Sequence, residues 1–237
     1  MIYVRHAGVG APVVLVHGLG VSSTYFGPLA AMLSRQMRVV APDLPGWGRS
    51  TRSENALDVP AAGRVLAGVI AFEALEAPTL VANSLGCQIA IELANRRPDL
   101  VGRLVLISPT VDPRYRSPAR QAWTLGVDWL REPPGLWPII VRDYWTMGTP
   151  RIVATAMHAL ADRPEDKLPH IAVPVLVIRG DRDASTTRVW AQRCADLAPN
   201  GRFEPIQGAA HAAHFSHPQT VAKLVLAFAS ERADRVD

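Results

Sequence analysis

The chain has 237 residues, of which 49% are hydrophobic and 19% are charged. This length fits one large α/β domain, and this balance of residues excludes wholesale disorder. The net charge is +4, but the arginines are scattered along the chain, so we expect no nucleic-acid partner. The two cysteines, Cys87 and Cys194, form neither a disulfide framework nor a zinc-binding pattern.

The N-terminal residues show no charged leader followed by an apolar segment. No stretch reaches the roughly 18 uninterrupted apolar residues of a membrane span. The sequence therefore predicts a cytoplasmic protein with neither a signal peptide nor a membrane span. Nothing in it indicates an oligomeric state.

Short apolar runs alternate with helix-like stretches along the chain. Continuous apolar runs, such as residues 13–16, are typical of strands buried on both faces of a parallel sheet. The predicted strands cover residues 2–5, 12–16, 38–41, 79–82, 101–107, 173–178 and 202–206. The predicted helices cover residues 25–35, 58–75, 85–95, 187–197 and 218–229. This alternation predicts an α/β fold with a mostly parallel central sheet flanked by helices.

Residues 109–168 break the alternation, because they contain no predicted strand and hold four of the six tryptophans. We expect them to form a helical cap inserted into a core made of residues 1–108 and 169–237. Large apolar side chains of such a cap could line a pocket or only pack the cap against the core. The candidate substrate-binding residues are Trp123, Trp129, Trp145 and Met147, with Tyr144 and Met157 as further wall residues.

Ser84 follows an apolar strand and precedes a helix-like stretch, which is the layout of a nucleophile elbow. The usual pattern is G-x-S-x-G, and this chain has Ala82 in the first position and Gly86 in the last. Alanine is small enough for the sharp turn. The alternative is a serine that only caps the following helix.

A serine nucleophile needs a base, a group that orients the base, and donors for the oxyanion. Asp183 follows the predicted strand 173–178, and ligand sites of open α/β sheets gather at that edge. Asp181, which is placed to brace the turn, and Asp112 are the competing acids. His211 lies in a loop of small residues and is the candidate base, whereas His17 precedes the serine and is expected to brace a loop.

The histidine run at 211, 214 and 217 could also indicate metal ligation. No cysteine or glutamate accompanies these histidines at a zinc spacing, so we expect no metal. The backbone N–H groups of Leu19 and Leu85 are the candidate oxyanion donors, since each lies in a glycine-containing turn near a strand end.

Five motifs carry a resemblance to the α/β-hydrolase superfamily, and it covers nearly the whole chain. They are HGLG (17–20), DLPGWGRS (43–50), NSLG (83–86), GDRD (180–183) and GAAH (208–211). The resemblance implies Ser84 as the nucleophile, His211 as the base and Asp183 as its orienter, with Leu19 and Leu85 at the oxyanion hole. It also implies that residues 43–50 brace the active-site loops and that the tryptophan-rich insert is the cap.

Haloalkane dehalogenase-like and epoxide hydrolase-like members carry Asp at the elbow, so Ser84 disfavours those chemistries. The sequence predicts a serine hydrolase that cleaves a small to medium hydrophobic carboxylic ester or lactone through an acyl-enzyme, without a cofactor. The same residues would serve C–C bond hydrolysis, thioester cleavage, cyclisation or perhydrolysis. A ligand-binding member of the fold without catalysis is the remaining alternative.

Overall fold

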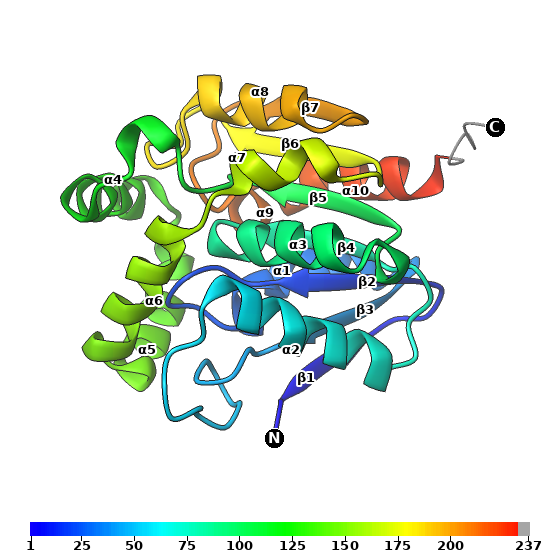
Figure 1. Cartoon of the computed structure of the whole chain (residues 1–237), viewed down its shortest axis with the longest axis horizontal. Coiled ribbons are helices and arrows are strands. Elements are labelled where there is room, and N and C mark those ends of the chain that lie inside the picture. Colours follow the sequence, from blue (N-terminus) through cyan, green and yellow to red (C-terminus); the bar gives the residue numbers. More distant parts are fainter. Residues whose placement is uncertain (232–237) are drawn as a thin grey trace.

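The computed structural model of the chain describes residues 1–231, and its centre is a single twisted sheet (Figure 1). The strands are β1 (Val4–Ala7), β2 (Ala11–Val16), β3 (Met37–Pro42), β4 (Thr79–Asn83), β5 (Arg103–Ile107), β6 (Val175–Gly180) and β7 (Gly201–Ile206). Within the described residues they lie in the order β1-β3-β2-β4-β5-β6-β7. β1 pairs antiparallel with β3, and every other pairing is parallel.

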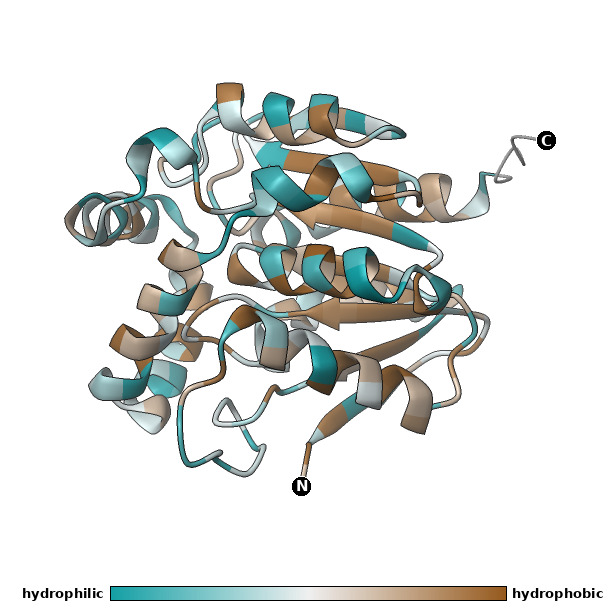
Figure 2. Ribbon diagram, viewed as in Figure 1, coloured by the Kyte–Doolittle hydropathy of each residue, from teal (hydrophilic) through white to brown (hydrophobic). Residues whose placement is uncertain are grey.

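Helices cover both faces of the sheet. The core helices are α1 (Gly27–Leu33), α2 (Val59–Phe72), α3 (Leu85–Arg96), α8 (Arg188–Leu197), α9 (Ala213–Ser216) and α10 (Pro218–Ser230). Successive side chains of a strand point to opposite faces. Val14 and Val16 accordingly join the cluster that contains α2, α3 and α8, whereas Val13 and Leu15 join the one that contains α1 and α10. Figure 2 shows the resulting apolar strands between helices of mixed polarity.

The connection from β5 to β6, all of which the structure describes, contains helices and loops but no strand. It contains α4 (Pro118–Arg131), α5 (Trp137–Met147), α6 (Thr149–Ala161) and α7 (Pro164–Lys167), with the 3₁₀ turns Pro113–Tyr115, Pro134–Leu136 and Leu168–His170. Figure 1 shows α4, α5 and α6 together beside one end of the sheet. Gln88 of α3 fastens this insert by donating from Nε2 to the carbonyl of Ala159, at 3.0 Å.

The structure confirms the predicted α/β class, with its mostly parallel sheet and helical insert, and corrects some boundaries. The helix expected over residues 25–35 begins as the 3₁₀ turn Ser23–Phe26 and continues as α1, because Pro28 fits the first turn of an α-helix. The short helix α9 follows His211, where a loop was expected. In the described part of the chain, no helix is long and apolar enough to cross a membrane.

Candidate active site

Ser84 occupies the sharp turn between β4 and α3. Its φ of 56° and ψ of −122° lie in a region that costs energy for any residue except glycine. The Ser84 N–H donates to the carbonyl of Ile107 at 3.1 Å, which ties this turn to the neighbouring strand β5. The side chain makes no capping hydrogen bond with α3. Helix capping, the alternative interpretation of Ser84, is therefore wrong.

Small residues around Ser84 let the turn pack tightly. A Cβ atom on Gly86 would lie 2.3 Å from the carbonyl oxygen of Val16, and real Cβ atoms do not approach so closely. A Cβ atom on Gly18 would lie 3.1 Å from the Cβ of Ser84 itself. Ala82, in the first position of the motif, is fully buried. The sequence pattern around the serine thus has a steric cause.

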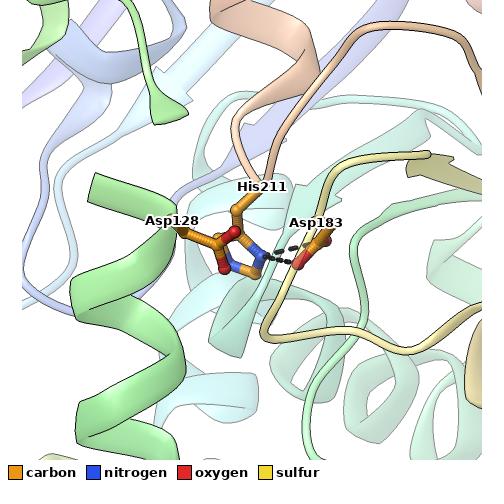
Figure 3. Close-up of side chains that lie close together, drawn as sticks. All are labelled: Asp128, Asp183 and His211. Carbon is orange, nitrogen blue, oxygen red and sulfur yellow. Dashed lines mark hydrogen bonds and ion pairs between the residues drawn. The ribbon is translucent and has the colours of Figure 1, made fainter. Parts of the chain in front are cut away.

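Asp183 and His211 come from the loops after the carboxyl ends of β6 and β7, and their side chains meet there (Figure 3). His211 Nδ1 lies 3.2 and 3.1 Å from the two carboxylate oxygens of Asp183. The backbone N–H groups of Ser185 and Thr186 donate to the same carboxylate. Burial alone would raise the pKa of Asp183, but the charge and the hydrogen bond of His211 outweigh it and lower that pKa.

The hydrogen bond to Asp183 leaves the other nitrogen of His211 to face away from the acid. This Nε2 is buried, and none of the described residues forms a hydrogen bond with it. The Ser84 hydroxyl is not bonded to it either. Burial lowers the pKa of His211, whereas Asp183, Asp128 and Glu132 raise it, and the balance places it at about 9. The imidazole is therefore protonated at neutral pH when the site is empty.

Ser84 and His211 open into one cavity of about 510 Å³, a typical size for a small-molecule site. Most of its wall is apolar. The insert contributes its apolar residues from α4, α5 and α6: Ala122, Leu125, Trp129, Ile140, Ile152, Val153, Ala156, Met157, Ala159 and Leu160. Within the described chain, no arginine or lysine lines the cavity, and its acidic side chains are Asp128 and Glu132.

Leu19 and Leu85, the predicted oxyanion donors, both line this cavity. Leu85 is the first residue of α3, so its N–H has no acceptor within the helix. Neither N–H donates a hydrogen bond to any of the residues 1–231. Both N–H groups are thus without an acceptor among these residues, and their role as oxyanion donors stays a prediction.

The four predicted substrate-binding residues have different positions. Trp129 lines the cavity, and so do the predicted wall residues Tyr144 and Met157. Trp123 and Trp145 are 72% and 87% exposed, and neither belongs to the described residues that line the cavity. Met147 is also absent from the wall, because it is buried in the core beneath the insert.

Asp128 and Glu132 are site residues that the sequence analysis missed. Both are buried, at 2% and 6% exposure, and burial raises the pKa of Glu132 to about 7. Asp128 lies in the last turn of α4 and Glu132 directly follows the helix, so their spacing of four residues is the signal that could have identified them. The sequence alone does not show that these two side chains turn toward His211.

Asp128, Asp183 and His211 have the donor types of a metal site, and their ligand atoms lie within 4.8 Å of one another. Protein donors already occupy this cluster. Asp128 accepts hydrogen bonds from the N–H groups of Ala184 and Ser185, and Asp183 accepts one from His211. A cation would have to displace these protons, so the donor set fits a proton-bearing network better than a metal.

The other histidines of the 211–217 run have separate surroundings. His214 packs against Tyr25 and Phe26, with ring centroids 4.3 and 4.4 Å away. His217 pairs its Nδ1 with the hydroxyl of Ser216 at 3.0 Å. The three histidines therefore do not converge on one point.

The competing acids of the sequence analysis have structural partners. Asp181 accepts the Gly208 N–H at 2.8 Å and braces its turn, as expected. Asp112 forms an ion pair with Arg114 and accepts a hydrogen bond from Thr187. Neither acid contacts His211.

His17 also has the bracing role expected of it. It accepts the Leu44 N–H on Nε2 at 3.0 Å, so its Nδ1 carries the proton and donates to the Gly18 carbonyl. Burial lowers the pKa of His17, which keeps this neutral form in place. The histidine thereby links the loop that contains Leu19 to the turn that begins at Asp43.

The chain belongs to the alpha/beta hydrolase family, whose model matches residues 13–224. One relative, an uncharacterized protein of Mycobacterium tuberculosis, is 36% identical over 104 residues. That match covers 44% of this chain and only 30% of the relative's length.

Two further similarities extend over nearly the whole chain. The pimeloyl-[acyl-carrier protein] methyl ester esterase of Neisseria meningitidis serogroup B (strain MC58) is 29% identical over 239 residues, which cover 90% of each protein. The crystal structure of the enol-lactonase from Burkholderia xenovorans LB400 superimposes with a TM-score of 0.83 over 97% of this chain and 96% of that one. Its sequence is 20% identical, so this likeness shows the common fold.

Proposed function

We propose that this chain is a serine hydrolase that cleaves small to medium hydrophobic carboxylic esters or lactones. One arrangement carries the proposal: the strained Ser84 shares an apolar cavity with His211, whose Nδ1 is bonded to Asp183. A strained serine, a histidine with a free Nε2 and a buried acid are the parts of an activated nucleophile. The similarity to an esterase over 90% of the chain supports the ester class.

In the proposed mechanism, the neutral His211 takes the proton of the Ser84 hydroxyl on Nε2. The oxygen attacks the carbonyl carbon of the substrate, and the N–H groups of Leu19 and Leu85 face the oxyanion. His211 then gives its proton to the leaving oxygen as the C–O bond breaks. Water releases the acyl group by the same steps, and Asp183 keeps the proton of His211 on Nδ1 throughout.

The cavity indicates the substrate class. Its apolar wall and volume of about 510 Å³ suit an acyl or alcohol group of moderate size. Asp128 and Glu132 line it without a neighbouring arginine or lysine among the described residues, so a substrate carboxylate would be repelled. We therefore expect neutral substrates, with the insert of residues 109–168 acting as their lid.

The test is labelling with a fluorophosphonate, followed by intact-protein mass spectrometry. Wild type should gain one adduct, and Ser84→Ala should gain none. Turnover of p-nitrophenyl acetate and butyrate should be lost in the same variant. Folded wild type that gains no adduct would show that Ser84 is not activated, and the proposed function would then be wrong.

A further inference from the structure

The last turn of α4 and the residue after it hold the loops that carry Asp183 and His211. Asp128 accepts the N–H groups of Ala184 and Ser185 at 2.8 and 2.9 Å, directly after Asp183 in the chain. Figure 3 shows Asp128 reaching from α4 toward the Asp183–His211 pair. The helical insert thus contacts the backbone that positions the proposed acid.

Arg131, the last residue of α4, and Glu132, which directly follows the helix, extend this contact. Arg131 donates from Nη1 to the carbonyl of Arg182 at 2.7 Å, so the backbone is held on both sides of Asp183. Glu132 accepts the N–H of Ala212 on Oε1 at 2.6 Å, directly after His211. The C-terminal end of α4 and the residue after it therefore contact the chain beside both the proposed acid and the proposed base.

The second oxygen of Glu132, Oε2, is buried and has no partner among the described residues. A buried carboxylate without full hydrogen bonding is costly unless an opposite charge compensates it. The imidazolium of His211 is the cation available on this side of the cavity. Asp128, Glu132 and the proposed base therefore stabilise each other's charged forms.

We propose that Asp128 and Glu132 are positioning residues of the proposed serine hydrolase, which fasten the acid and base loops to the cap and hold a proton on His211. This inference rests on the proposed function, because it assigns the two acids a role in that reaction. The cap then does more than cover the substrate. It sets both the place and the charge of the base.

Other charged and titratable groups also face His211. Asp183 lies on the loop after β6, and Arg179 of β6 donates to its backbone carbonyl at 2.7 Å. His214 of α9 packs against Tyr25, and burial, together with the charge of His211, lowers the pKa of His214 to about 3, so it carries no positive charge near neutral pH. Asp183, Asp128 and Glu132 raise the pKa of His211, in that order.

Glu132→Gln is the sharpest variant. The amide oxygen can still accept the Ala212 N–H, and the amide nitrogen replaces an oxygen that has no partner. The variant therefore removes the charge and keeps the anchor. Asp128→Asn is less suitable, since one of its two accepting oxygens would become a donor that faces another N–H.

The first measurement is an NMR titration of the His211 ring, with its signal assigned by loss in His211→Asn. The midpoint should lie about one pH unit lower in Glu132→Gln than in wild type. Glu76→Gln, at an exposed position before β4, is the matched control and should leave the midpoint unchanged. An unchanged midpoint in Glu132→Gln would overturn the electrostatic part of the proposal.

The second measurement is the pH profile of kcat and kcat/KM on p-nitrophenyl butyrate. The rising limb should shift with the titration, which makes Glu132→Gln about tenfold faster than wild type near pH 7. Glu132→Met, which loses the anchor as well, should have an alkaline plateau kcat roughly tenfold below that of Glu132→Gln. Equal plateaus, with thermal melts that show both variants folded, would overturn the positioning part.

The titration needs no substrate, so it separates the two proposals. A shifted His211 midpoint without fluorophosphonate labelling of Ser84 would leave the coupling between cap and histidine correct and the hydrolase function wrong. Labelling of Ser84 with an unshifted His211 midpoint would leave the hydrolase function correct and the coupling between the insert and the histidine wrong.

Discussion

Asp183 accepts the Nδ1–H of His211 with both carboxylate oxygens, at 3.2 and 3.1 Å. Asp183→Asn would favour the wrong imidazole tautomer, so we expect kcat to fall by roughly 10⁴-fold, as in the Ser-His-Asp template. Asp181→Asn should change kcat little, because its oxygen can still accept the Gly208 N–H. Steady-state kinetics of both variants would check this. Comparable losses would contradict the assignment of the acid.

The rate of wild type should rise with pH up to an unusually alkaline midpoint. His211 must be neutral to accept a proton, and its pKa is raised to about 9. We therefore expect log kcat/KM to climb with pH and to level off above about pH 9. Initial rates across pH 6–10, corrected for spontaneous hydrolysis, would show this limb. A midpoint near the ordinary histidine value would contradict the raised pKa.

His214→Phe should protect the fold against acid. His214 is completely buried, and its pKa is lowered to about 3 from an unfolded value of 6.5. A depressed histidine pKa means that the unfolded chain binds the proton first, so stability is lost as the pH falls below 6.5. The variant removes this loss. Its free energy of unfolding relative to wild type should improve by roughly 3 kcal/mol between pH 7.5 and pH 4.5.

Urea denaturation of both proteins at the two pH values would measure that change. Comparing the proteins with each other cancels the titrations that they share, the opposite contribution of His211 included. An equal difference in stability at both pH values would show that His214 is not a source of acid sensitivity.

Two glycines should respond oppositely to alanine. Gly86→Ala would push a Cβ atom to 2.3 Å from the Val16 carbonyl, and we expect a loss of about 3 kcal/mol or failure to fold. Gly126 lies inside α4 with open space around its Cβ position, so Gly126→Ala should stabilise the protein by up to about 1 kcal/mol. Denaturant midpoints would give both values. A tolerated Gly86→Ala would mean that the elbow can relax.

Two tryptophans of α4 should differ in their effect on substrates. Trp129 lines the cavity, whereas Trp123 is 72% exposed and lies outside the lining. We expect Trp129→Ala to lower kcat/KM for p-nitrophenyl butyrate about tenfold through lost apolar contact. Trp123→Ala should leave it within about twofold. A similar loss in both variants would mean that the helix as a whole, and not the Trp129 ring, determines the effect.

Much of the core could be predicted because its signals are local. Each buried parallel strand is a continuous apolar run, and the order of Ser84, Asp183 and His211 follows from the strand ends on which they lie. The small residues beside Ser84 also follow from a local steric demand. Such features need no knowledge of how distant segments pack.

The contacts of the helical insert could not be predicted to the same depth, since they depend on how α4 packs against the core. The aromatic content of the insert led to the prediction of Trp123 and Trp145, which are exposed to solvent. It gave no indication of Asp128 and Glu132, which are buried. An amphipathic pattern gives the faces of a helix but not the partner of each face. The same limit hid the enclosed position of His214.

The hydrogen bonds that Asp128 and Glu132 accept from the chain beside Asp183 and His211 limit which inserts could replace this one. A transplanted insert without acids at positions 128 and 132 would leave the N–H groups of Ala184 and Ala212 without their present acceptors, whereas the Ser185 N–H would keep Asp183. Each buried donor without a partner costs about 1–3 kcal/mol. The insert and the core of this protein are therefore matched parts, and a chimera would need acids at both positions to keep these hydrogen bonds.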